Sequence, residues 1–405
     1  MLKRAYHFVV GIFSVIWFRF PGRQLTVIGV TGTDGKTTTT TLIYEILKNA
    51  GIKASMITSV HAVIAGREYD TGFHVTTPNA FYVQKYLRAA VDHGDTHMVL
   101  EVTSHALDQY RVFGIPFRVG VITNVTHEHL DWHKTLKHYL QTKFTLLRQS
   151  HIAILNRDEK NIFEESKQSL TDNSVITYGL KEDADITPKT FPFDTLLLGQ
   201  FNKYNCLAAI SAAKALSIDP KIIRTTLRKF RGVVGRMEVM YKKDFTVIVD
   251  FAHTPNAITQ VLSTVQPMTK GKLIHVFGSA GLRDYSKRPL MGKASSEFAD
   301  VIILTEEDYR TENLDTIMDQ IQKGIAKTKE VCRVGNRKEA IKKAFSFVEK
   351  GDTVILTGKG HEKSLCRGTI EYPWSDQEEV KKILKEIRNS NIEIQNKFKA
   401  QLPNV

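Results

Sequence analysis

The 405-residue chain contains only three cysteines, Cys206, Cys332 and Cys366, and these lie far apart. An odd number without a C-x-x-C pair offers neither a disulfide framework nor a cysteine metal site, a pattern typical of a reducing compartment. Short repeats and low-complexity segments are absent as well. With 42% hydrophobic and 24% charged residues the chain can bury a large core, and its length predicts two or three domains. We therefore expect a globular cytoplasmic protein.

Acidic residues are in the minority, with 43 Asp and Glu against 56 Lys and Arg, which gives a formal net charge of +13. Such an excess favours anionic partners such as nucleotides, carboxylates, membrane surfaces or nucleic acid. The basic helical stretches at 221–231 and 378–388 lack the interleaved aromatic side chains on which single-stranded bases stack. The sequence therefore predicts no nucleic-acid partner.

The apolar run at residues 5–20, AYHFVVGIFSVIWFRF, is shorter than the roughly 20 residues that span a bilayer. No small-residue cleavage site follows it, so a secretion signal is not expected. Two interpretations remain open. The run is either a helix packed on the protein or a peripheral contact with the inner membrane surface, whose basic flanks are Lys3, Arg4, Arg19 and Arg23.

Eight short apolar runs are each followed by polar or glycine-rich residues and then by a helical period. This pattern predicts strands buried on both faces of parallel sheets. The runs lie at residues 25–30, 97–102, 119–124, 151–156, 245–250, 272–278, 300–305 and 352–358. In open α/β sheets ligands bind beyond the carboxyl ends of the strands, and nearly every candidate functional residue follows such a run.

The order of these runs predicts an α/β protein with two main domains. We place a boundary near residues 230–240, where a helical stretch gives way to Gly232 and Gly235 and a new series of strands begins. The expected parts are an apolar N-terminal segment at 1–22, a P-loop central domain with a mostly parallel sheet at 23–235, a Rossmann-like C-terminal α/β domain at 236–390 and a tail at 391–405.

The stretch LTVIGVTGTDGKTTTTTLIYEIL predicts a strand, a phosphate-binding loop and a helix. The standard spacing G-x-x-x-x-G-K-[ST] fails, because Val30 replaces the first glycine. Gly32 and Gly35 still allow the backbone to fold around phosphates, and the helix beginning near Lys36 directs its free N–H groups at them. Lys36 would neutralise the β and γ oxygens, and Thr37 would offer its hydroxyl to Mg²⁺.

The loop TGTDGKTTT resembles the T-G-T-[ND]-G-K-[ST] loop of the Mur ligase superfamily, which explains the altered glycine spacing. Three further segments resemble its MurE branch, which adds the third amino acid to the peptidoglycan precursor: HVTTPNA, EVTSHALDQYRV and TNVTHEHLDWHKTLKHYLQTKFTLL. Thr103 stands for a serine of the branch, and Glu128 for an aspartate. The resemblance implies ATP contacts by Gly32, Thr33, Asp34, Gly35, Lys36, Thr37 and Thr38, and substrate contacts by Thr76, Thr77, Thr103 and Arg111.

A metal site is expected beside this loop. Bringing ATP against a carboxylate substrate places two anions in contact, which a divalent metal must screen. Mg²⁺ takes oxygen ligands and an occasional imidazole, so we expect the ligands Thr37, Glu101 and His129. The resemblance implies that two ions are bound. The resemblance also implies that Lys143 is carbamylated and holds the second ion, and that Lys36, His129 and Lys143 are catalytic.

Taken alone, HEHLDWH at 127–133 is compatible with a zinc site, so a metal-dependent hydrolase is an alternative of a different class. The neighbouring phosphate loop favours nucleotide chemistry instead. In that case His127 and His133 are expected to be hydrogen-bonded structural histidines.

Segments of the second half carry further nucleotide candidates. LLGQFNKYNCLAAISAA resembles the family's G-x-x-N-x-x-N helix start, which implies that Asn202 and Asn205 reach the nucleotide. An ordinary N-cap by Asn202 is the open alternative. GRMEV and DFAHTPNAI resemble family segments that imply ATP contacts by Arg236, Asp250 and His253.

FGSAGLRDYSKRPLMG resembles a glycine-rich family loop in which Ala280 replaces one glycine. Arg283 and Lys287 of this loop would meet phosphate or the forming acyl phosphate, and both are predicted to be catalytic. A solvated basic loop is the alternative.

The incoming amino acid is expected to meet TEEDYRTE and TGKGHE. Branch members that add meso-diaminopimelate carry D-N-P-R in the first segment, where this chain has E-D-Y-R, so the Asn and Pro are missing. Arg310 would clamp a distal carboxylate, and Glu362 would bind an ammonium group. Asp308 and Gly358 complete the predicted substrate contacts.

The resemblance covers about residues 24–385. MurE proteins begin with a domain of roughly a hundred residues that holds the UDP end of the substrate. Some two dozen residues precede the loop in this chain. We therefore expect either that another surface holds a nucleotide-sugar peptide or that the acceptor is lipid-linked.

These observations together predict an ATP-dependent amide ligase of peptidoglycan precursor synthesis. It would add a free amino acid, with meso-diaminopimelate favoured, to a UDP-MurNAc-dipeptide-like carboxylate through an acyl phosphate. A folylpolyglutamate or poly-γ-glutamate type ligase is the alternative within the superfamily.

Overall fold

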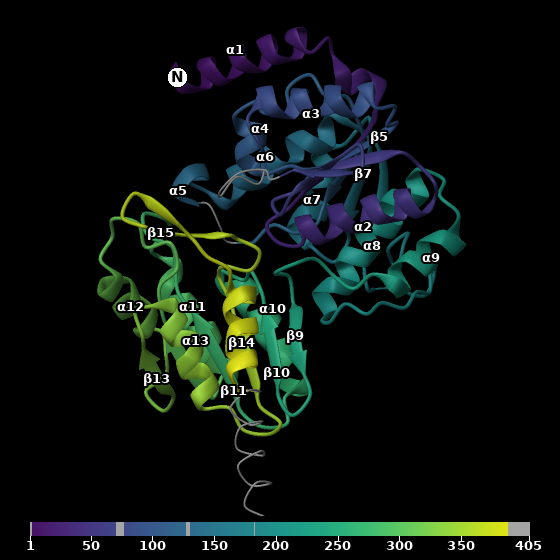
Figure 1. Ribbon diagram of the computed structural model, residues 1–405. Coiled ribbons are helices and arrows are strands. Elements are labelled where there is room, and N and C mark those ends of the chain that lie inside the picture. The colour runs from purple at the N-terminus through teal and green to yellow at the C-terminus, as the bar shows by residue number, and fades with distance from the viewer. Residues whose placement is uncertain (1, 70–76, 127–129, 182, 388–405) are drawn as a thin grey trace, which may run out of the picture. The chain divides into compact units, whose positions relative to one another are not determined.

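The structure, a computed structural model, describes residues 2–69, 77–126, 130–181 and 183–387 (Figure 1). The chain divides between Val233 and Val234 into two compact units, each built on its own mostly parallel sheet. The predicted tail at 391–405 lies outside the described residues. None of the helices in the described ranges is long and apolar enough to cross a membrane.

The first unit carries an eight-stranded sheet in the order β4-β3-β2-β5-β1-β6-β7-β8. The six neighbours β2, β5, β1, β6, β7 and β8 are parallel to one another, whereas β3 pairs antiparallel with both β2 and β4. Its elements are α1 (Leu2–Trp17), η1 (Pro21–Gln24), β1 (Thr26–Thr31), α2 (Lys36–Asn49), β2 (Ala54–Ile57), β3 (Ala62–Ile64), β4 (Arg67–Tyr69), α3 (Ala80–Asp92), β5 (His97–Glu101), α4 (Ser104–Asp108), β6 (Phe117–Ile122), α5 (Leu130–His133), α6 (Leu136–Arg148), β7 (Ser150–Asn156), α7 (Lys160–Ser169), β8 (Ser174–Tyr178), α8 (Gln200–Ala215) and α9 (Pro220–Lys229).

Successive residues of the central strand β1 face opposite sides of this sheet, as the two-residue period of a strand requires. Val27 packs with residues of α3 and α4, whereas Ile28 and Val30 pack with residues of α2, α8 and α9. Both faces of the sheet are therefore covered by helices, which is why its central strands β1, β5 and β6 are buried along nearly their whole length.

The second unit carries a six-stranded sheet in the order β13-β12-β11-β14-β10-β9, parallel except for the edge strand β9. Its elements are β9 (Glu238–Lys242), β10 (Thr246–Val249), α10 (Pro255–Val265), η2 (Gln266–Met268), β11 (Leu273–Phe277), α11 (Lys287–Phe298), β12 (Val301–Leu304), α12 (Leu314–Gln322), β13 (Glu330–Arg333), α13 (Arg337–Ser346), β14 (Thr353–Leu356), the hairpin β15 (Ser364–Arg367) and β16 (Ile370–Pro373), and a helix at 376–387.

Helices cover both faces of this second sheet as well. Ile274 and Val276 of β11 pack with α13 and with Val380 of the last helix. Between them, His275 points to the other face and bonds to Ser295 of α11. The eight predicted strands are all present as parallel strands, four in each sheet, which confirms the predicted α/β fold.

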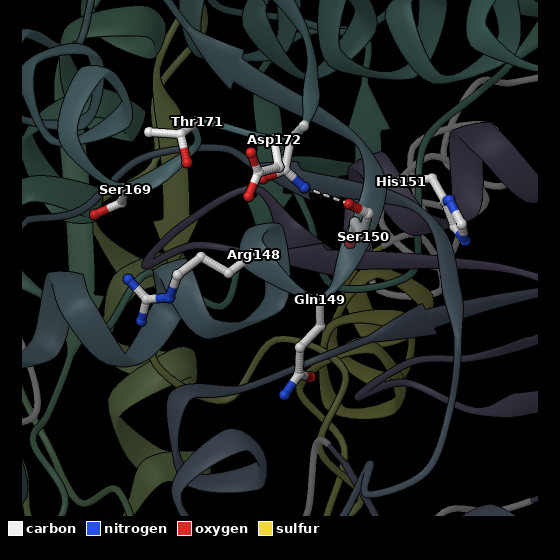
Figure 2. A pocket seen from close by; sticks show the side chains of 8 residues that line it. Arg148, Gln149, Ser150, His151, Ser169, Thr171 and Asp172 are labelled. Carbon is white, nitrogen blue, oxygen red and sulfur yellow. Dashed lines mark hydrogen bonds between the residues drawn. The ribbon is translucent and has the colours of Figure 1, made fainter.

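A hollow of about 440 Å³ opens at the amino ends of β7 and β8 (Figure 2). It is lined by residues 148–151 and by Ser169, Thr171, Asp172 and Asn173. The Asn173 amide donates a hydrogen bond to the Ser150 carbonyl. Because β1, β6, β7 and β8 run parallel, this hollow lies at the edge of the sheet opposite to the phosphate loop. It is therefore not part of the predicted site.

Candidate active site

The loop between β1 and α2 is shaped by two glycines. Gly35 has φ +81° and ends the loop as the residue preceding α2, while Gly32 has φ +152°. A Cβ atom on Gly35 would lie 2.2 Å from Asn205 Oδ1, and one on Gly32 would lie 1.8 Å from Thr123 Oγ1. Other residues would have to displace these side chains, so both positions require glycine.

Residues that follow β6 hold the loop in place through neutral hydrogen bonds. Asp34 N donates to Asn124 Oδ1 at 2.9 Å, and Thr123 Oγ1 donates to Asp34 O at 2.7 Å. Thr126 N donates to Thr33 Oγ1 at 3.1 Å. No side chain of the described residues caps α2, so the N–H groups of its first turn, which includes Thr38, are directed at the loop.

Two lysines place ammonium groups on successive carbonyls of the loop. Lys36 Nζ lies 2.7 Å from Thr33 O, and Lys143 Nζ, from α6, lies 2.6 Å from Gly32 O. The Lys143 side chain is buried, and its Nζ lies 4.3 Å from the centre of the Tyr139 ring. The helix N-terminus and the Lys36 ammonium together form an arrangement that binds phosphate.

The predicted oxygen ligands Thr37 and Glu101 lie in contact at this end of the sheet. Glu101 ends β5 and pairs with Val30 in the strand register, so its carboxylate reaches α2. Thr37 Oγ1 lies 3.2 and 3.0 Å from the two Glu101 oxygens, and Ser59 N donates to Glu101 Oε2 at 2.9 Å. This cluster of hard oxygen atoms fits Mg²⁺.

The remaining predicted metal ligand, His129, lies outside the described residues. Within the ranges that the structure describes, no three His, Cys, Asp or Glu side chains form a metal-binding group. Ser59 was not predicted from the sequence, because its partner Glu101 lies 42 positions further along the chain. Nothing in its local pattern distinguishes it from a loop serine.

His133 of the HEHLDWH segment is a buried structural histidine. Its Nε2 lies 3.0 Å from Ser104 Oγ, and its ring packs on Tyr139. Burial, and then the positive charges of His105 and His138, lower the pKa of His133 to about 4. His127 lies outside the described residues.

The predicted acceptor contacts gather around the end of β5. Thr77 Oγ1 donates to Glu101 O at 2.9 Å and accepts from Thr103 N at 3.2 Å. Arg111 Nη1 donates to Thr77 O at 2.6 Å. Thr103 also caps α4 by accepting from Ala106 N, and Thr76 lies outside the described residues. Three of the four candidates therefore form one hydrogen-bonded group.

Asn202 and Asn205 lie in the first turns of α8 and form a pair. The residue preceding α8 is Gly199, so the alternative that Asn202 is an ordinary N-cap is wrong. Asn202 Nδ2 donates to Leu198 O at 2.7 Å, and Asn205 Nδ2 donates to Asn202 Oδ1 at 2.9 Å. This pairing holds Asn205 against Gly35 of the phosphate loop.

In the second unit, Asp250, Arg236 and His253 gather around Phe251. Asp250 Oδ2 accepts from Met237 N at 2.6 Å, which ties the end of β10 to the turn before β9. The Arg236 guanidinium lies 4.4 Å from the centre of the Phe251 ring, and His253 Nδ1 lies 2.9 Å from Phe251 O. The three predicted nucleotide contacts of this unit therefore lie close together.

Arg283 and Lys287 occupy the loop and first turn that lead into α11. Arg283 is exposed, whereas Lys287 is buried. The loop is organised by Arg288, which the sequence did not single out: its guanidinium pairs with Glu312 at 2.5 Å and donates to Ala280 O at 3.0 Å.

The segments predicted to meet the amino acid are joined by buried ion pairs. Lys359 Nζ lies 2.8 Å from Asp308 and 2.5 Å from Glu362, so these two acids share one cation. Arg310 has φ +53° and donates from Nη1 to Gly281 O at 2.7 Å, which ties it to the glycine-rich loop.

Glu307, between these residues, was also not predicted from the sequence. It is buried beside Gly358, and its Oε2 atom has no hydrogen-bond partner among the described residues. Burial raises the pKa of Glu307, while the nearby charges of His253 and Lys359 oppose the rise. A buried carboxyl oxygen without a hydrogen-bond partner in the described ranges, on a group with a shifted pKa beside two charged side chains, is typical of a ligand site.

The sequence matches the Mur ligase middle domain family over residues 30–213 and the Mur ligase, glutamate ligase domain family over residues 235–360. It is 39% identical over 386 residues to the UDP-N-acetylmuramoyl-L-alanyl-D-glutamate–2,6-diaminopimelate ligase of Aquifex aeolicus (strain VF5), a match that covers 91% of this chain and 79% of the relative. The chain belongs to the Mur ligase family.

Solved structures of other Mur ligases resemble the fold. A UDP-N-acetylmuramoyl-L-alanyl-D-glutamate–2,6-diaminopimelate ligase superimposes with a TM-score of 0.61 and 28% identity, covering 92% of this chain and 81% of the other. Folylpolyglutamate synthase of Mycobacterium tuberculosis, solved with ADP and AMPPCP, superimposes with a TM-score of 0.67 at 16% identity, covering 85% and 91%. The second likeness concerns the fold alone.

Mur ligases are ATP-dependent ligases, so membership of the family confirms the predicted enzyme class and the predicted use of ATP. It also decides against the alternative of a metal-dependent hydrolase.

Proposed function

We propose that this Mur ligase joins an amino acid to the carboxylate of a UDP-MurNAc-dipeptide-like acceptor in peptidoglycan precursor synthesis. The observation that carries the proposal is the phosphate loop, in which Lys36 and Lys143 face the loop carbonyls and Thr37 contacts Glu101. In this proposal the γ-phosphoryl group passes from ATP to the acceptor carboxylate. The amine then displaces phosphate from the acyl phosphate and forms the amide.

Positioning and charge are the proposed means of catalysis. The loop N–H groups and Lys36 hold the triphosphate, while Arg283 and Lys287 of the second unit offset the charge of the acyl phosphate. Asn202 and Asn205, with Arg236, Asp250 and His253, are proposed to contact the nucleotide.

Two Mg²⁺ ions are part of the proposal. Thr37 and Glu101 would hold one ion together with His129, and bound magnesium would screen the phosphate and carboxylate charges from each other. A carbamylated Lys143 would supply oxygen ligands to the second ion. Mass spectrometry of the intact protein tests the modification, since carbamylation adds a carboxylate that acid treatment releases.

The proposed amino acid is meso-diaminopimelate. The Aquifex aeolicus relative is named as a 2,6-diaminopimelate ligase, and Arg310 supplies the planar cation that suits a distal carboxylate. Glu362, with Asp308 and Gly358, would contact the amino group. Thr76, Thr77, Thr103 and Arg111 are proposed to meet the acceptor.

Phosphate release from ATP tests the proposal directly. The reaction is measured with UDP-MurNAc-L-Ala-D-Glu and a panel of amino acids that includes meso-diaminopimelate, L-lysine and L-ornithine. It is then repeated with a lipid-linked form of the acceptor. Release that requires both an acceptor and meso-diaminopimelate supports the proposal, and ATP turnover indifferent to every acceptor contradicts it. Contact of residues 5–20 with a membrane would be a property separate from this chemistry.

A further inference from the structure

Helix α1 lies along the outer side of the first unit, next to α3 (Figure 1). One face of it is packed on the protein. Phe8 lies edge-on to the rings of Tyr110 and Phe113, at 5.1 and 5.3 Å between ring centres, and Val15 is buried beside Gly114. The helix is therefore anchored by its inner face, and its outer face keeps a fixed orientation.

The outer face of α1 is apolar, which is unusual for an exposed helix surface. Its members recur at helical spacing, so they share one side of the helix. They are Tyr6 (65% exposed), Val9 (63%), Phe13 (53%), Ile16 (59%) and Trp17 (63%). Single exposed apolar side chains are ordinary, but a continuous patch of them marks an interaction surface. We call these five residues the outer face of α1.

The charges around this face identify its partner. Helix α1 contains no acidic residue, and the exposed Arg19 and Arg23 follow its carboxyl end. Arg4, near the amino end, instead lies 3.8 Å from Asp108 and over the Tyr110 ring that Phe8 also contacts. We propose that the outer face of α1 binds the surface of a bilayer that contains anionic lipids, with the apolar side chains among the acyl chains and Arg19 and Arg23 at the headgroups. The proposal is independent of the ligase chemistry.

Two other occupants fit the observations less well. A second copy of this chain paired in parallel would bring Arg19 and Arg23 of the two copies together, and this repulsion disfavours such a pair. A membrane-spanning role does not suit α1, because its 16 residues extend over only about 24 Å against the roughly 30 Å of a hydrocarbon core. A helix lying in the interface accommodates both the apolar face and the basic residues that follow its carboxyl end.

Sedimentation of the full chain with vesicles tests the proposal. Wild type should bind vesicles of phosphatidylcholine with one third phosphatidylglycerol, bind pure phosphatidylcholine more weakly, and lose binding at high salt. The double variant Phe13→Ser with Trp17→Ser should lose at least about tenfold in vesicle affinity, because two large side chains no longer leave water on binding. Its matched control, Leu196→Ser with Ile370→Ser, changes two other exposed apolar residues and should bind as wild type does.

Two charge-removing variants test whether binding depends on the arginines next to α1 or only on the net positive charge of the protein. Arg19→Gln with Arg23→Gln should weaken binding about fivefold for each charge, which corresponds to about 1 kcal/mol. Lys221→Gln with Lys229→Gln removes the same charge from exposed positions on α9 and should leave binding unchanged. Equal losses in the two variants would overturn the proposal, because binding would then follow net charge alone.

Quenching by brominated lipid locates the contact. Trp17 should be quenched on bound vesicles, so Trp17→Phe should lose most of the quenching and Trp132→Phe should retain it. Absence of vesicle binding by wild type, or a dimer in light scattering that Phe13→Ser with Trp17→Ser abolishes, would overturn the proposal. Phosphate release with soluble substrates should be the same in all these variants without vesicles, which separates this outcome from a failure of the proposed ligase function.

Discussion

The phosphate loop of the first unit and the 305–312 and 357–362 segments of the second unit occupy equivalent places, since each follows the carboxyl ends of parallel strands. The loop is held by neutral hydrogen bonds to residues 123–126, and it presents a helix N-terminus beside the Lys36 ammonium. The segments of the second unit are instead joined by ion pairs centred on Lys359. We infer that the first site attracts any suitable anion, such as a phosphate group. The second site selects a ligand by whether its charged groups can replace partners in the ion pairs of Lys359.

The largest expected effect is the loss of Lys36. Lys36→Ala should lower the rate of acceptor-dependent phosphate release by about 10³-fold, because it removes a cation aimed at charge that develops during phosphoryl transfer. The melting temperature should stay near that of wild type, since the Lys36 ammonium bonds to the Thr33 carbonyl of its own loop and joins no distant elements among the described residues.

Lys48→Ala is the matched control, because Lys48 lies exposed in the last turn of the same helix. It should keep the full rate. A Lys36→Ala protein that releases phosphate at a near-normal rate would contradict the proposed role of the loop.

Gly35→Ala tests the shape of the loop rather than its charge. The added Cβ would lie 2.2 Å from Asn205 Oδ1, and φ +81° is strained for alanine, so affinity for a nonhydrolysable ATP analogue should fall by roughly 10²-fold. Calorimetric titration measures it.

Gly51→Ala provides the comparison for this strain. Gly51 has nearly the same φ, +77°, but no atoms lie within 4 Å of the position that its Cβ would take. The substitution should therefore cost only about 1–2 kcal/mol of unfolding free energy and leave nucleotide affinity unchanged. Equal loss of nucleotide affinity in the two variants would show that backbone strain alone, and not the contact with Asn205, explains the effect.

The sequence predicted the interior of both sheets better than their edges. Interior strands of a parallel sheet are buried on both faces and appear as continuous apolar runs, as in 97–102 and 352–358. Edge strands such as β4 and β13 are largely exposed and carry no such run, so they were missed. The local sequence pattern is therefore sufficient to predict an interior strand, whereas an edge strand forms because of its pairing with a strand that is distant in sequence.

The same division applies to the candidate site. The loop residues were predicted because a motif places them within a few positions of each other. Ser59, Arg288 and Glu307 were missed because their partners are distant in sequence or because burial alone distinguishes them. Spacing in the chain contains no direct information about either property.

Asp308→Asn tests the paired charges of the second unit. The variant leaves Lys359 buried with Glu362 as its remaining acidic partner, and an amide keeps an acceptor for Cys366 N. The free energy of unfolding should fall by about 2–3 kcal/mol, somewhat less than for a buried ion left with no partner. Chemical denaturation measures it.

Asp319→Asn is the control, because it breaks the exposed pair with Arg333. It should change the free energy of unfolding by less than about 0.5 kcal/mol. Similar values for the two variants would mean that the buried pair adds little to stability.

The second unit also contains a buried histidine, His275, that forms no ion pair with the other described residues. The fold keeps its ring neutral instead of pairing a positive charge with an acid. Burial, and then the charge of Arg337, lower the pKa of His275 to about 3, and its ring nitrogens lie 2.8 and 2.9 Å from the Ser295 and Thr357 hydroxyls. The unfolded chain binds a proton near the usual pKa of about 6.5, whereas the folded chain does not. The stabilising contribution of neutral His275 is therefore complete above that pH and is lost as the pH falls toward 3.

His275→Gln removes this linkage. Between pH 7 and pH 5.5 wild type should lose about 1 kcal/mol more unfolding free energy than the variant does, because the slope approaches about 1.4 kcal/mol for each pH unit. The variant itself should be less stable at pH 7, since glutamine cannot reproduce the stacking of the ring on Phe277, so the slope and not the absolute stability is the measured quantity. His151→Gln, at an exposed position in the first unit, should keep the slope of wild type. Parallel pH profiles for wild type and His275→Gln would mean that protons reach His275 in the folded protein, and that this core is less closed to charge than its burial implies.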